Sequence, residues 1–582
     1  MPSPRSWIAL TLLAQLCCPA AAQSSDLDTL LEDDRSKAIE LPPGGIDGSG
    51  AGSEPVPKAV AMADAPSGRF VEYSRAARGS NGKVRLLAAT YFGTTGDEAF
   101  SEAIILPDQT IVAAGTFATL PPLKAAPLRV FGTDLPDSRF PPPPPAPADS
   151  KAIPRDPKAT VVLVHYSADL STILNVIRFP YAAASLRRIQ ATPDGQLLIV
   201  ASLEPAASES GLLQHVKPRI EENPAAVAAA AERNRRPGND SLLLRIDPRT
   251  WTTVWSVLWK HRSIDAVPLA NGATLVESGR SYFVLNRSGA IERSFDLPSD
   301  VSWRVRTRLE AHADGSFYIG GEYHSGTGRE PYRNPLLHRF NPDGKTRWTA
   351  WNWTGPIVGN DAVRLVSDSA VRIVRVCDDD TILVAGWSDG GNTVFTRQPY
   401  DIEAPHGKSS FAGSTWGAGV LSVSHILRLD AKTMQVRGHA QWLSYLTHTN
   451  KPNSARIDDI AHLPDGRCIV VGGTSHAMIE TPDAWITPFI KAKDDQPGPK
   501  GGNALVIYSP DFDQLLFATH LPCVRDLRLA APAHGRFVIV GAAAPDPEKH
   551  PSLRQPLLPN ALQPAFGGGR TDAYIMLVEA AK

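Results

Sequence analysis

Charged side chains recur at one place in a phrase that this sequence repeats seven times. They lie six residues before a turn residue, or beside that position in the fifth copy, and they are Glu102, Arg188, Asp265, Arg308, Arg372, Asp459 and Arg528. Their signs nearly alternate along the chain. Opposite charges on neighbouring repeats can pair, which avoids burying a lone charge, and such a set can equally form a polar site that grips a charged ligand. If the seven repeats form a ring, we expect these residues at the mouth of its central channel, either in ion pairs between repeats or in a ligand site.

Catalytic motifs of fixed spacing are missing from the sequence. It contains no GxSxG elbow, no HExxH, no Walker loop and no GxGxxG between a strand and a helix. The remaining catalytic possibility is a pair of carboxylates, for which Glu98 and Asp459 are the least implausible choice. Such a pair would have to come within about 10 Å over a concave surface to act on a glycosidic bond. No residue is therefore assigned as catalytic.

Metal-ligand spacing is also missing. The 15 histidines are dispersed, and the closest pairs, His462 with His476 and His312 with His324, belong to different strands or loops. Cys377, Cys468 and Cys523 are too far apart for a paired-cysteine zinc site, a c-type haem attachment or a disulfide framework. The acidic run 378–380 lacks the alternating carboxylates of a calcium loop. The sequence thus predicts neither a metal nor a cofactor.

Charge and hydropathy narrow the class of protein. Lys plus Arg number 59 and Asp plus Glu 60, so a net charge of −1 gives no field that would attract nucleic acid. Arg5, an apolar run from Trp7 to Leu16 and the alanines before Gln23 are typical of a secretory leader, with cleavage expected after Ala22. No later stretch is apolar over the 18 or so residues of a transmembrane helix. We expect a secreted or periplasmic protein without a transmembrane segment.

The organisation predicted for the chain is a leader at 1–22, a low-complexity tether at 23–82 and a repeat domain at 83–582. The repeated phrase is an apolar run, a turn of the Pro-Asp-Gly type, a second apolar run and a small residue or Gly, which describes a β-hairpin. The turn residues are Asp108, Asp194, Asn271, Asp314, Asp379, Asp465 and His534.

A second hairpin follows each repeated hairpin except the last, as in LLHRFNPDGKTRWTAWNW from Leu336. Two hairpins make a four-stranded sheet, and small sheets that bury their faces on one another form a propeller. The last unit lacks a fourth strand, and an extra strand from Val84 precedes the first unit. We therefore predict an all-β, seven-bladed β-propeller of four-stranded antiparallel blades, closed by the N-terminal strand in the last blade.

Two segments carry a resemblance to a known family. YFGTTGDEAF from Tyr91 and FGGGRTDAYIMLV from Phe566 resemble the seven-bladed β-propeller repeat of secreted bacterial proteins. That resemblance implies architecture and export, and it brings no catalytic residues. FNPDGKTRW, ending at Trp348, is also similar to the repeats of pyrroloquinoline-quinone dehydrogenases, but the mature chain lacks the adjacent cysteines of those enzymes.

Long insertions are expected between the second and third strands of five blades, at 117–157, 204–239, 388–420, 475–502 and 543–571. They would share one face of the propeller, where binding usually resides, although permissive loops of this composition often make no contacts. The sequence favours a monomeric, non-catalytic binding or scaffolding module with a protein or carbohydrate ligand on that face. The alternatives are a lyase or glycoside hydrolase acting on extracellular polysaccharide, and a quinoprotein dehydrogenase.

Overall fold

The computed structural model describes residues 84–118, 128–130, 160–179, 183–203, 219–221, 240–260, 263–298, 305–324, 333–351, 368–389, 394–410, 422–445, 452–485, 502–521, 524–531, 535–543 and 561–581. The predicted leader, the predicted tether, Cys523 and large parts of the predicted insertions lie outside these residues. Within the described part of the chain, no helix is long and apolar enough to cross a membrane.

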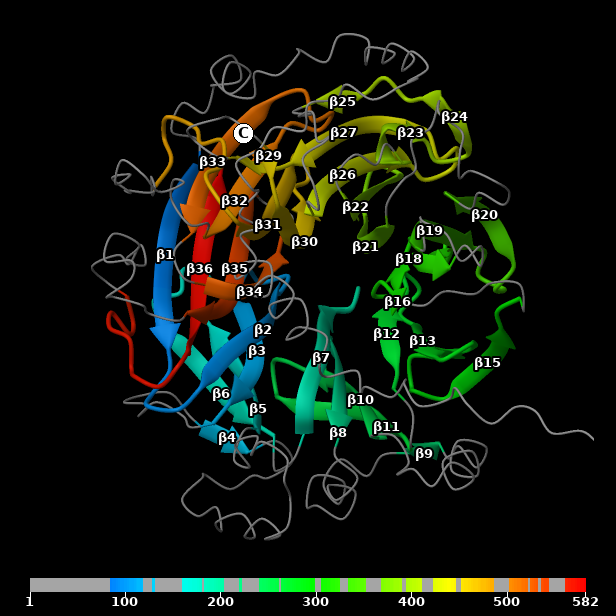
Figure 1. Cartoon of the computed structure of the whole chain (residues 1–582). Coiled ribbons are helices and arrows are strands. Elements are labelled where there is room, and N and C mark those ends of the chain that lie inside the picture. The colour runs from blue at the N-terminus through cyan, green and yellow to red at the C-terminus, as the bar shows by residue number, and fades with distance from the viewer. Residues whose placement is uncertain are drawn as a thin grey trace, which may run out of the picture. The chain divides into compact units, whose positions relative to one another are not determined.

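Seven antiparallel sheets stand as blades around a central axis, which confirms the predicted β-propeller (Figure 1). We number the blades in chain order and give their strands from the axis outward. Blade 1 contains β2 (Glu98–Ile105), β3 (Ile111–Phe117), β5 (Thr160–Tyr166) and β6 (Ile173–Arg178). Blade 2 contains β7 (Ala183–Ala191), β8 (Leu197–Leu203), β10 (Asp240–Asp247) and β11 (Thr252–Trp259). Blade 3 contains β12 (Asp265–Pro268), β13 (Thr274–Ser278), β14 (Ser281–Leu285) and β15 (Ile291–Asp296).

The other four blades repeat this order. In blade 4 the innermost position is shared by two short strands that both pair with β18, namely β16 (Val305–Arg306) and β17 (Glu310–Ala311). They are followed by β18 (Phe317–His324), β19 (Arg333–Phe340) and β20 (Thr346–Ala350). Blade 5 contains β21 (Ser369–Val376), β22 (Thr381–Asp389), β26 (Ser422–Asp430) and β27 (Val436–Trp442). Blade 6 contains β30 (Ala455–His462), β31 (Cys468–Thr474), β32 (Asn503–Tyr508) and β33 (Leu515–Leu521). Blade 7 contains β34 (Val524–Ala530), β35 (Arg536–Ala543), β36 (Asp572–Ala580) and β1 (Val84–Phe92).

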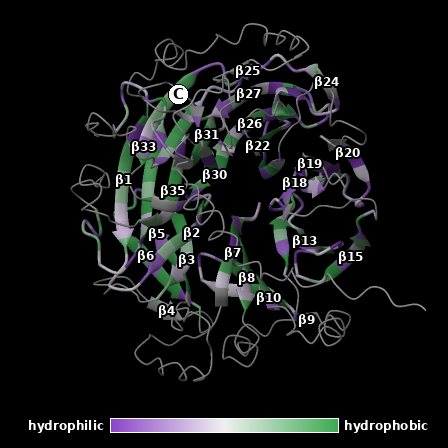
Figure 2. Cartoon of the chain, viewed as in Figure 1, coloured by the Kyte–Doolittle hydropathy of each residue, from purple (hydrophilic) through white to green (hydrophobic). Residues whose placement is uncertain are grey.

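The hydrophobic core lies between the blades. Seven clusters of buried residues each join two adjacent blades, and the cluster that contains Phe92 and Phe100 joins blade 7 to blade 1. Successive residues of a strand point to opposite faces, so Ile199 packs toward blade 1 and Val200 toward blade 3. Because both faces of a blade are buried, strands such as β8, β31 and β35 are apolar at successive positions rather than at alternate ones. Figure 2 shows hydrophobic residues running through the blades, with hydrophilic stretches in strands such as β15.

Ring closure depends on the two ends of the described chain. β1 pairs antiparallel with β36, from Val84 opposite Ala580 to Phe92 opposite Ala573. The extra N-terminal strand therefore completes blade 7, as the strand count predicted. This pairing removes the unpaired edge that would otherwise remain at the seam.

The outer edges of five blades are covered by segments that follow their second strand. In blades 1, 2 and 5 a short fifth strand pairs parallel with the outermost strand: β4 (Leu128–Val130), β9 (Arg219–Glu221) and β25 (Ser409–Ser410). In blade 6 the amide of Thr481 donates to Ala518 O of β33 at 3.1 Å. In blade 7 the amide of Gln563 donates to Thr90 Oγ1 of β1 at 2.8 Å. We call these five segments the edge caps.

Blade 3 has another form of edge protection. Its second and third strands are joined by only Gly279 and Arg280, so there is no room for a cap. Its outermost strand β15 instead carries Glu292, Arg293 and Asp296. Charges on an edge strand oppose pairing with another chain.

Small elements complete the described structure. A 3-10 turn η2 (Val394–Thr396) and the hairpin of β23 (Arg397–Gln398) and β24 (Asp401–Pro405) lie between β22 and β26. The pair β28 (Ser444–Tyr445) and β29 (Pro452–Asn453) joins blade 5 to blade 6.

β-Bulges interrupt the innermost strands of five blades. The register shifts between Phe100 and Glu102 in β2, and the same shift occurs in β7, β21, β30 and β34, at 186–188, 371–373, 457–459 and 525–528. A bulge bends the strand and changes the direction of the side chains beside it. In β2, β7, β30 and β34 the charged residue of the repeat directly follows the bulge, so the bulge sets where that side chain points. In β21 the residue after the bulge is Ile373, and Arg372 is the bulged residue.

The bulge also explains the glycine that ends several copies of the repeat. An ideal Cβ on Gly472 of β31 would lie 2.0 Å from Arg456 O, and one on Gly115 of β3 would lie 1.8 Å from Ala99 O. In both cases the obstructing atom is a backbone carbonyl beside a bulge. Only a residue without Cβ allows this close approach.

Gly472→Ala should destabilise the fold, because strand β30 would have to move away from β31. We expect a loss of about 3 kcal/mol in the free energy of unfolding, at the upper end of ordinary overpacking. The measurement is chemical denaturation, with Gly502→Ala as the control, since the nearest atom to a Cβ at Gly502 is 3.7 Å away. Equal midpoints for the two variants would show that the bulge can relax at no cost.

Candidate functional site

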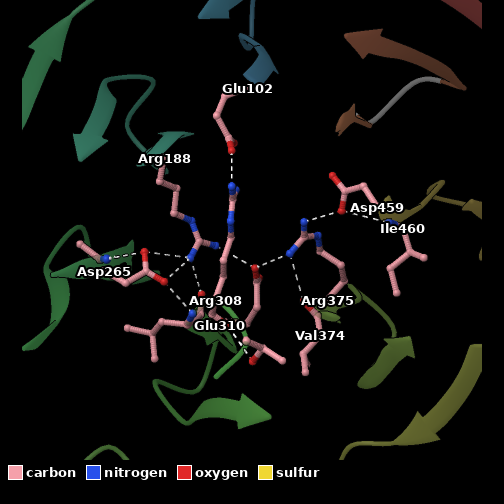
Figure 3. A network of polar contacts seen from close by, with 12 residues as sticks. Glu102, Arg188, Asp265, Arg308, Glu310, Val374, Arg375, Asp459 and Ile460 are labelled. Carbon is pink, nitrogen blue, oxygen red and sulfur yellow. Dashed lines mark hydrogen bonds and ion pairs between the residues drawn. The ribbon is translucent and has the colours of Figure 1, made fainter. Parts of the chain in front are cut away.

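The charged residues of the repeat meet in a network of ion pairs around the axis (Figure 3). Arg308 of blade 4 pairs with Glu102 of blade 1 at 2.5 Å between Nη2 and Oε1. Arg188 of blade 2 pairs with Asp265 of blade 3 at 3.1 Å and with Glu310 of blade 4 at 2.8 Å. Blades 1 and 4 are not neighbours in the ring, so this network reaches across the channel.

Arg375 continues the network on the other side. Its guanidinium pairs with Glu310 at 2.9 Å and with Asp459 of blade 6 at 2.6 Å. Blade 7 joins through the backbone, because Arg528 donates to Asp458 O at 3.1 Å and the amide of Leu529 donates to Asp459 Oδ2 at 3.1 Å. All seven blades are thus connected by polar contacts on the axis.

Six of the seven residues selected from the sequence are brought together in this way, and Arg372 is not. Arg372 is the bulged residue of β21; its guanidinium lies 3.7 Å from Glu322 and over the ring of Trp387. Its place in the network is taken by Arg375, and Glu310 is a second member that the six-residue rule did not select. Both follow a repeat position by two residues, which keeps them on the same face of the strand.

The carboxylates of the network stabilise the positive charges of its arginines. Burial opposes the positive charge of Arg308, but Glu102 and more distant acids outweigh it, so the pKa of Arg308 lies above its usual value. Burial likewise opposes the charge of Arg375, and Asp459 and Glu310 raise its pKa. Both guanidinium groups already have carboxylate partners. An axial ligand would have to displace these partners.

The carboxylates considered for glycoside chemistry have separate partners. Glu98 is fully buried and accepts hydrogen bonds from the amide of Thr94 at 3.1 Å and from its hydroxyl at 3.2 Å. Asp459 is bound by Arg375. The acid that senses the charge of Glu98 is Asp572, whose pKa is raised to about 6 by burial and then by Glu98. No observation joins Glu98 and Asp459 into one site.

Glu98 and Asp572 belong to the seam between blades 7 and 1, where the two family-like segments lie side by side. The amide of Arg570 donates to Asp97 Oδ1 at 2.9 Å, and the amide of Gly567 donates to Asp572 Oδ2 at 2.6 Å. Gly569 has φ +72°, and a Cβ there would lie 1.9 Å from Gly96 O. The glycine-rich segment therefore packs against the turn at Gly96 and Asp97, and a side chain at Gly569 would prevent this approach.

A chain of buried polar side chains runs through blade 5. Ser388 Oγ lies 3.0 Å from His425 Nε2, and His425 Nδ1 lies 3.0 Å from His439 Nε2. This connectivity resembles that of a nucleophile, a base and an orienting group. However, Ser388 and His425 are each only 1% exposed, and the third group is a neutral imidazole instead of a carboxylate. Burial lowers the pKa of His425 to about 3, so it is a poor general base near neutral pH.

Cysteines and metal ligands add nothing to this site. Cys377 and Cys468 are buried and unbridged, and burial raises the pKa of the Cys377 thiol to about 11. Among the residues that the structure describes, no three side chains of His, Cys, Asp or Glu converge as a metal site with three protein ligands requires.

Comparisons with known proteins find only distant structural similarities. No family model and no curated protein matches the chain. Solved structures that resemble it include the RRP9 WD40 repeats, at 9% identity over 86% of this chain and 99% of that chain, with a TM-score of 0.36. A protein of unknown function from Bacteroides caccae matches at 9% identity over 62% and 89%, with a TM-score of 0.29. A quinohemoprotein alcohol dehydrogenase from Comamonas testosteroni matches at 11% identity over 69% and 76%, with a TM-score of 0.25.

These similarities are too distant to carry a function. Their identities are near one in ten, and proteins with this architecture include both binding modules and enzymes. The resemblance to the secreted bacterial repeat family remains a prediction from the two quoted segments. The β-propeller fold of this chain rests on the strand order of its seven sheets.

Proposed function

We propose that this protein is an exported, non-catalytic binding module, whose partner docks on the face that carries the connections between the second and third strands of the blades. The observation that supports this proposal is the position of five long connections. They leave the ends of β3, β8, β22, β31 and β35 and return to β5, β10, β26, β32 and β36. In an antiparallel blade these ends all lie on one face. Long connections on one face of a rigid scaffold are a common place for binding.

The axis is a weaker candidate for ligand binding. The guanidinium groups of Arg188, Arg308 and Arg375 are already paired with carboxylates. A buried pair that loses one partner is strongly destabilised. The network therefore fits a structural role, in which it connects the blades, better than a ligand site.

The net charge and the predicted leader limit the class of partner. A net charge of −1 does not favour nucleic acid, so we propose a protein or a carbohydrate. From the leader predicted at 1–22, we propose that the partner lies in the periplasm or outside the cell. N-terminal sequencing of the protein from a periplasmic fraction should begin at Gln23, and an intact Met1 in that fraction would contradict export by this leader.

The docking face can be tested with a deletion in blade 6. Residues 475–485 must be kept, because Met478 is buried and Trp485 packs on Phe517 with ring centroids 5.0 Å apart. Replacing residues 486–501 with a short Gly-Ser linker should leave the thermal midpoint nearly unchanged, because that midpoint depends on the blades. We expect capture of a partner identified by cross-linking with the wild-type protein to fall at least tenfold.

The matched variant is Arg308→Glu, which changes the axis and leaves the connections intact. A structural axis predicts a lower thermal midpoint with partner capture retained at low temperature. Loss of capture in Arg308→Glu, with full capture after the deletion, would place the ligand on the axis and refute the proposed face.

A further inference from the structure

A histidine and a glutamate of blade 6 face each other without a hydrogen bond. His520 lies on β33 and is 3% exposed, and Glu480 lies in the segment that follows β31. Their nearest atoms, His520 Nε2 and Glu480 Oε1, are 3.3 Å apart. Neither atom has a hydrogen-bond partner within the described structure. Two buried polar atoms without a partner are costly unless something lies between them.

The protonation of His520 can be assigned from its other contact. The ring makes a hydrogen bond to the backbone of Asn503. Because Nε2 has no hydrogen-bond partner within the described residues, we assign this bond to Nδ1–H, which leaves the lone pair of Nε2 on the side of Glu480. The imidazole lone pair and the carboxylate oxygen are both acceptors. Their approach requires a proton or a cation between them.

We propose that Glu480 and His520 are the two protein ligands of an open site for a divalent transition metal such as Zn²⁺. Tetrahedral ligands about 2.0–2.1 Å from zinc lie about 3.3–3.4 Å from one another, which matches the separation of the two atoms. Imidazole nitrogen and carboxylate oxygen are both zinc ligands. The bond from Nδ1 to a backbone carbonyl is the outer contact that zinc-binding histidines usually make.

The rest of the coordination would come from water. The side chain of Glu480 is 19% exposed, which gives the metal a path from solvent. No third His, Cys, Asp or Glu among the described residues completes a closed site. The site would thus be open, and its affinity lower than that of a structural zinc centre with four protein ligands.

The position of the site links it to the proposed docking face. Glu480 precedes Thr481, whose amide covers the edge of β33, and His520 lies on β33 itself. A bound metal would fasten the start of the blade 6 connection to the outermost strand. This consequence for partner binding rests on the proposed function, whereas metal binding itself does not.

The test is calorimetric titration of the tag-free full chain with ZnCl₂ near pH 7.5. We expect one zinc per chain, with binding at least tenfold weaker in Glu480→Gln and in His520→Gln, and unchanged in the control His462→Gln. Mg²⁺ should not compete, because it prefers an all-oxygen octahedral shell. Circular dichroism of each variant checks that it is folded.

Two results would overturn the inference. One is the absence of zinc binding by the wild-type chain, which would mean that a proton is shared between Glu480 and His520. The other is equal binding by wild type and both variants, which would place the zinc elsewhere. If the variants fail to fold, visible absorption of Co²⁺ added to the wild-type chain decides, since tetrahedral coordination gives bands that hydrated Co²⁺ lacks. These measurements use the purified chain without a binding partner, so none of their results depends on the proposed function.

Discussion

Below pH 6.5 the protein should lose stability steeply, because three histidines of blade 5 are buried in the neutral form. His406 is 7% exposed, His425 1% and His439 0%. Burial lowers the pKa of His406 to about 4 and that of His425 to about 3, and holds the pKa of His439 well below its usual value. In the unfolded chain each titrates at about 6.5. Unfolding therefore takes up protons as the pH falls below that value.

The sign and size of the effect follow from proton linkage. The contribution of these histidines is complete above pH 6.5 and is lost as the pH falls toward 4. Each proton taken up on unfolding lowers the free energy of unfolding by about 1.4 kcal/mol per pH unit, or about 4 kcal/mol per unit for all three. Asp572 acts in the opposite sense, because its raised pKa of about 6 stabilises the folded state in acid. His520 and Glu480, with pKa values of about 4 and 7, offset each other.

Urea denaturation between pH 5.0 and 7.5 measures this dependence. The control is the double variant His425→Gln and His439→Gln, which should be less stable at pH 7.5 but should lose about 2.7 kcal/mol less per pH unit below 6.5. An unchanged slope in the double variant would mean that other groups take up the protons.

Arg188→Leu should be among the most damaging single substitutions in the chain. The side chain of Arg188 is 5% exposed, pairs with Asp265 and Glu310, and donates to Leu309 O at 2.6 Å. Its loss leaves two carboxylates with less compensation near the axis. We expect the free energy of unfolding to fall by about 3–5 kcal/mol, the usual cost of removing one partner of a buried ion pair.

The matched control is Arg249→Leu. Arg249 also pairs with an aspartate, Asp247 at 2.8 Å, but its side chain is 83% exposed. This variant should keep the wild-type midpoint, because solvent screens exposed pairs. Adding Asp265→Asn to Arg188→Leu should restore part of the loss, since it removes the carboxylate that loses its ion pair, whereas Glu310 still pairs with Arg375. A wild-type midpoint for Arg188→Leu would show that the network does not hold the blades together.

The fold could be predicted from the sequence because the hairpin pattern repeats and because the number of strands fits a closed ring. Hairpins with Pro-Asp-Gly turns recur, and the strand from Val84 is the one needed to complete the last blade. The strand order of blade 7, with β1 outermost, confirms that count. Buried strands with apolar residues at successive positions also left little choice of architecture.

The axial network could be predicted only in part, because a bulge is invisible to a count of residues. The count assumes a regular strand, and each bulge shifts the alternation by one position. In the fifth copy the count gives Ile373, which has no charge, and the charged residue beside it, Arg372, is the bulged residue, while Arg375 lies beside Glu310 and Asp459. A search for charges two residues after each repeat position would have found Glu310 and Arg375. The edge caps could not be predicted from the sequence, because strands of two or three residues are too short to show a hydrophobic periodicity.

The pairing of β1 with β36 also fixes an order of events during folding. Blades 1 to 6 each consist of consecutive strands and can form as the chain emerges, with loop closures that are short except at the connections. In blade 7, Val84 of β1 pairs with Ala580 of β36, so β1 can join its blade only after the rest of the domain has been synthesised. Contacts of such large sequence separation form slowly. Until then β36 has an open edge, and this interval is when the chain is most exposed to aggregation.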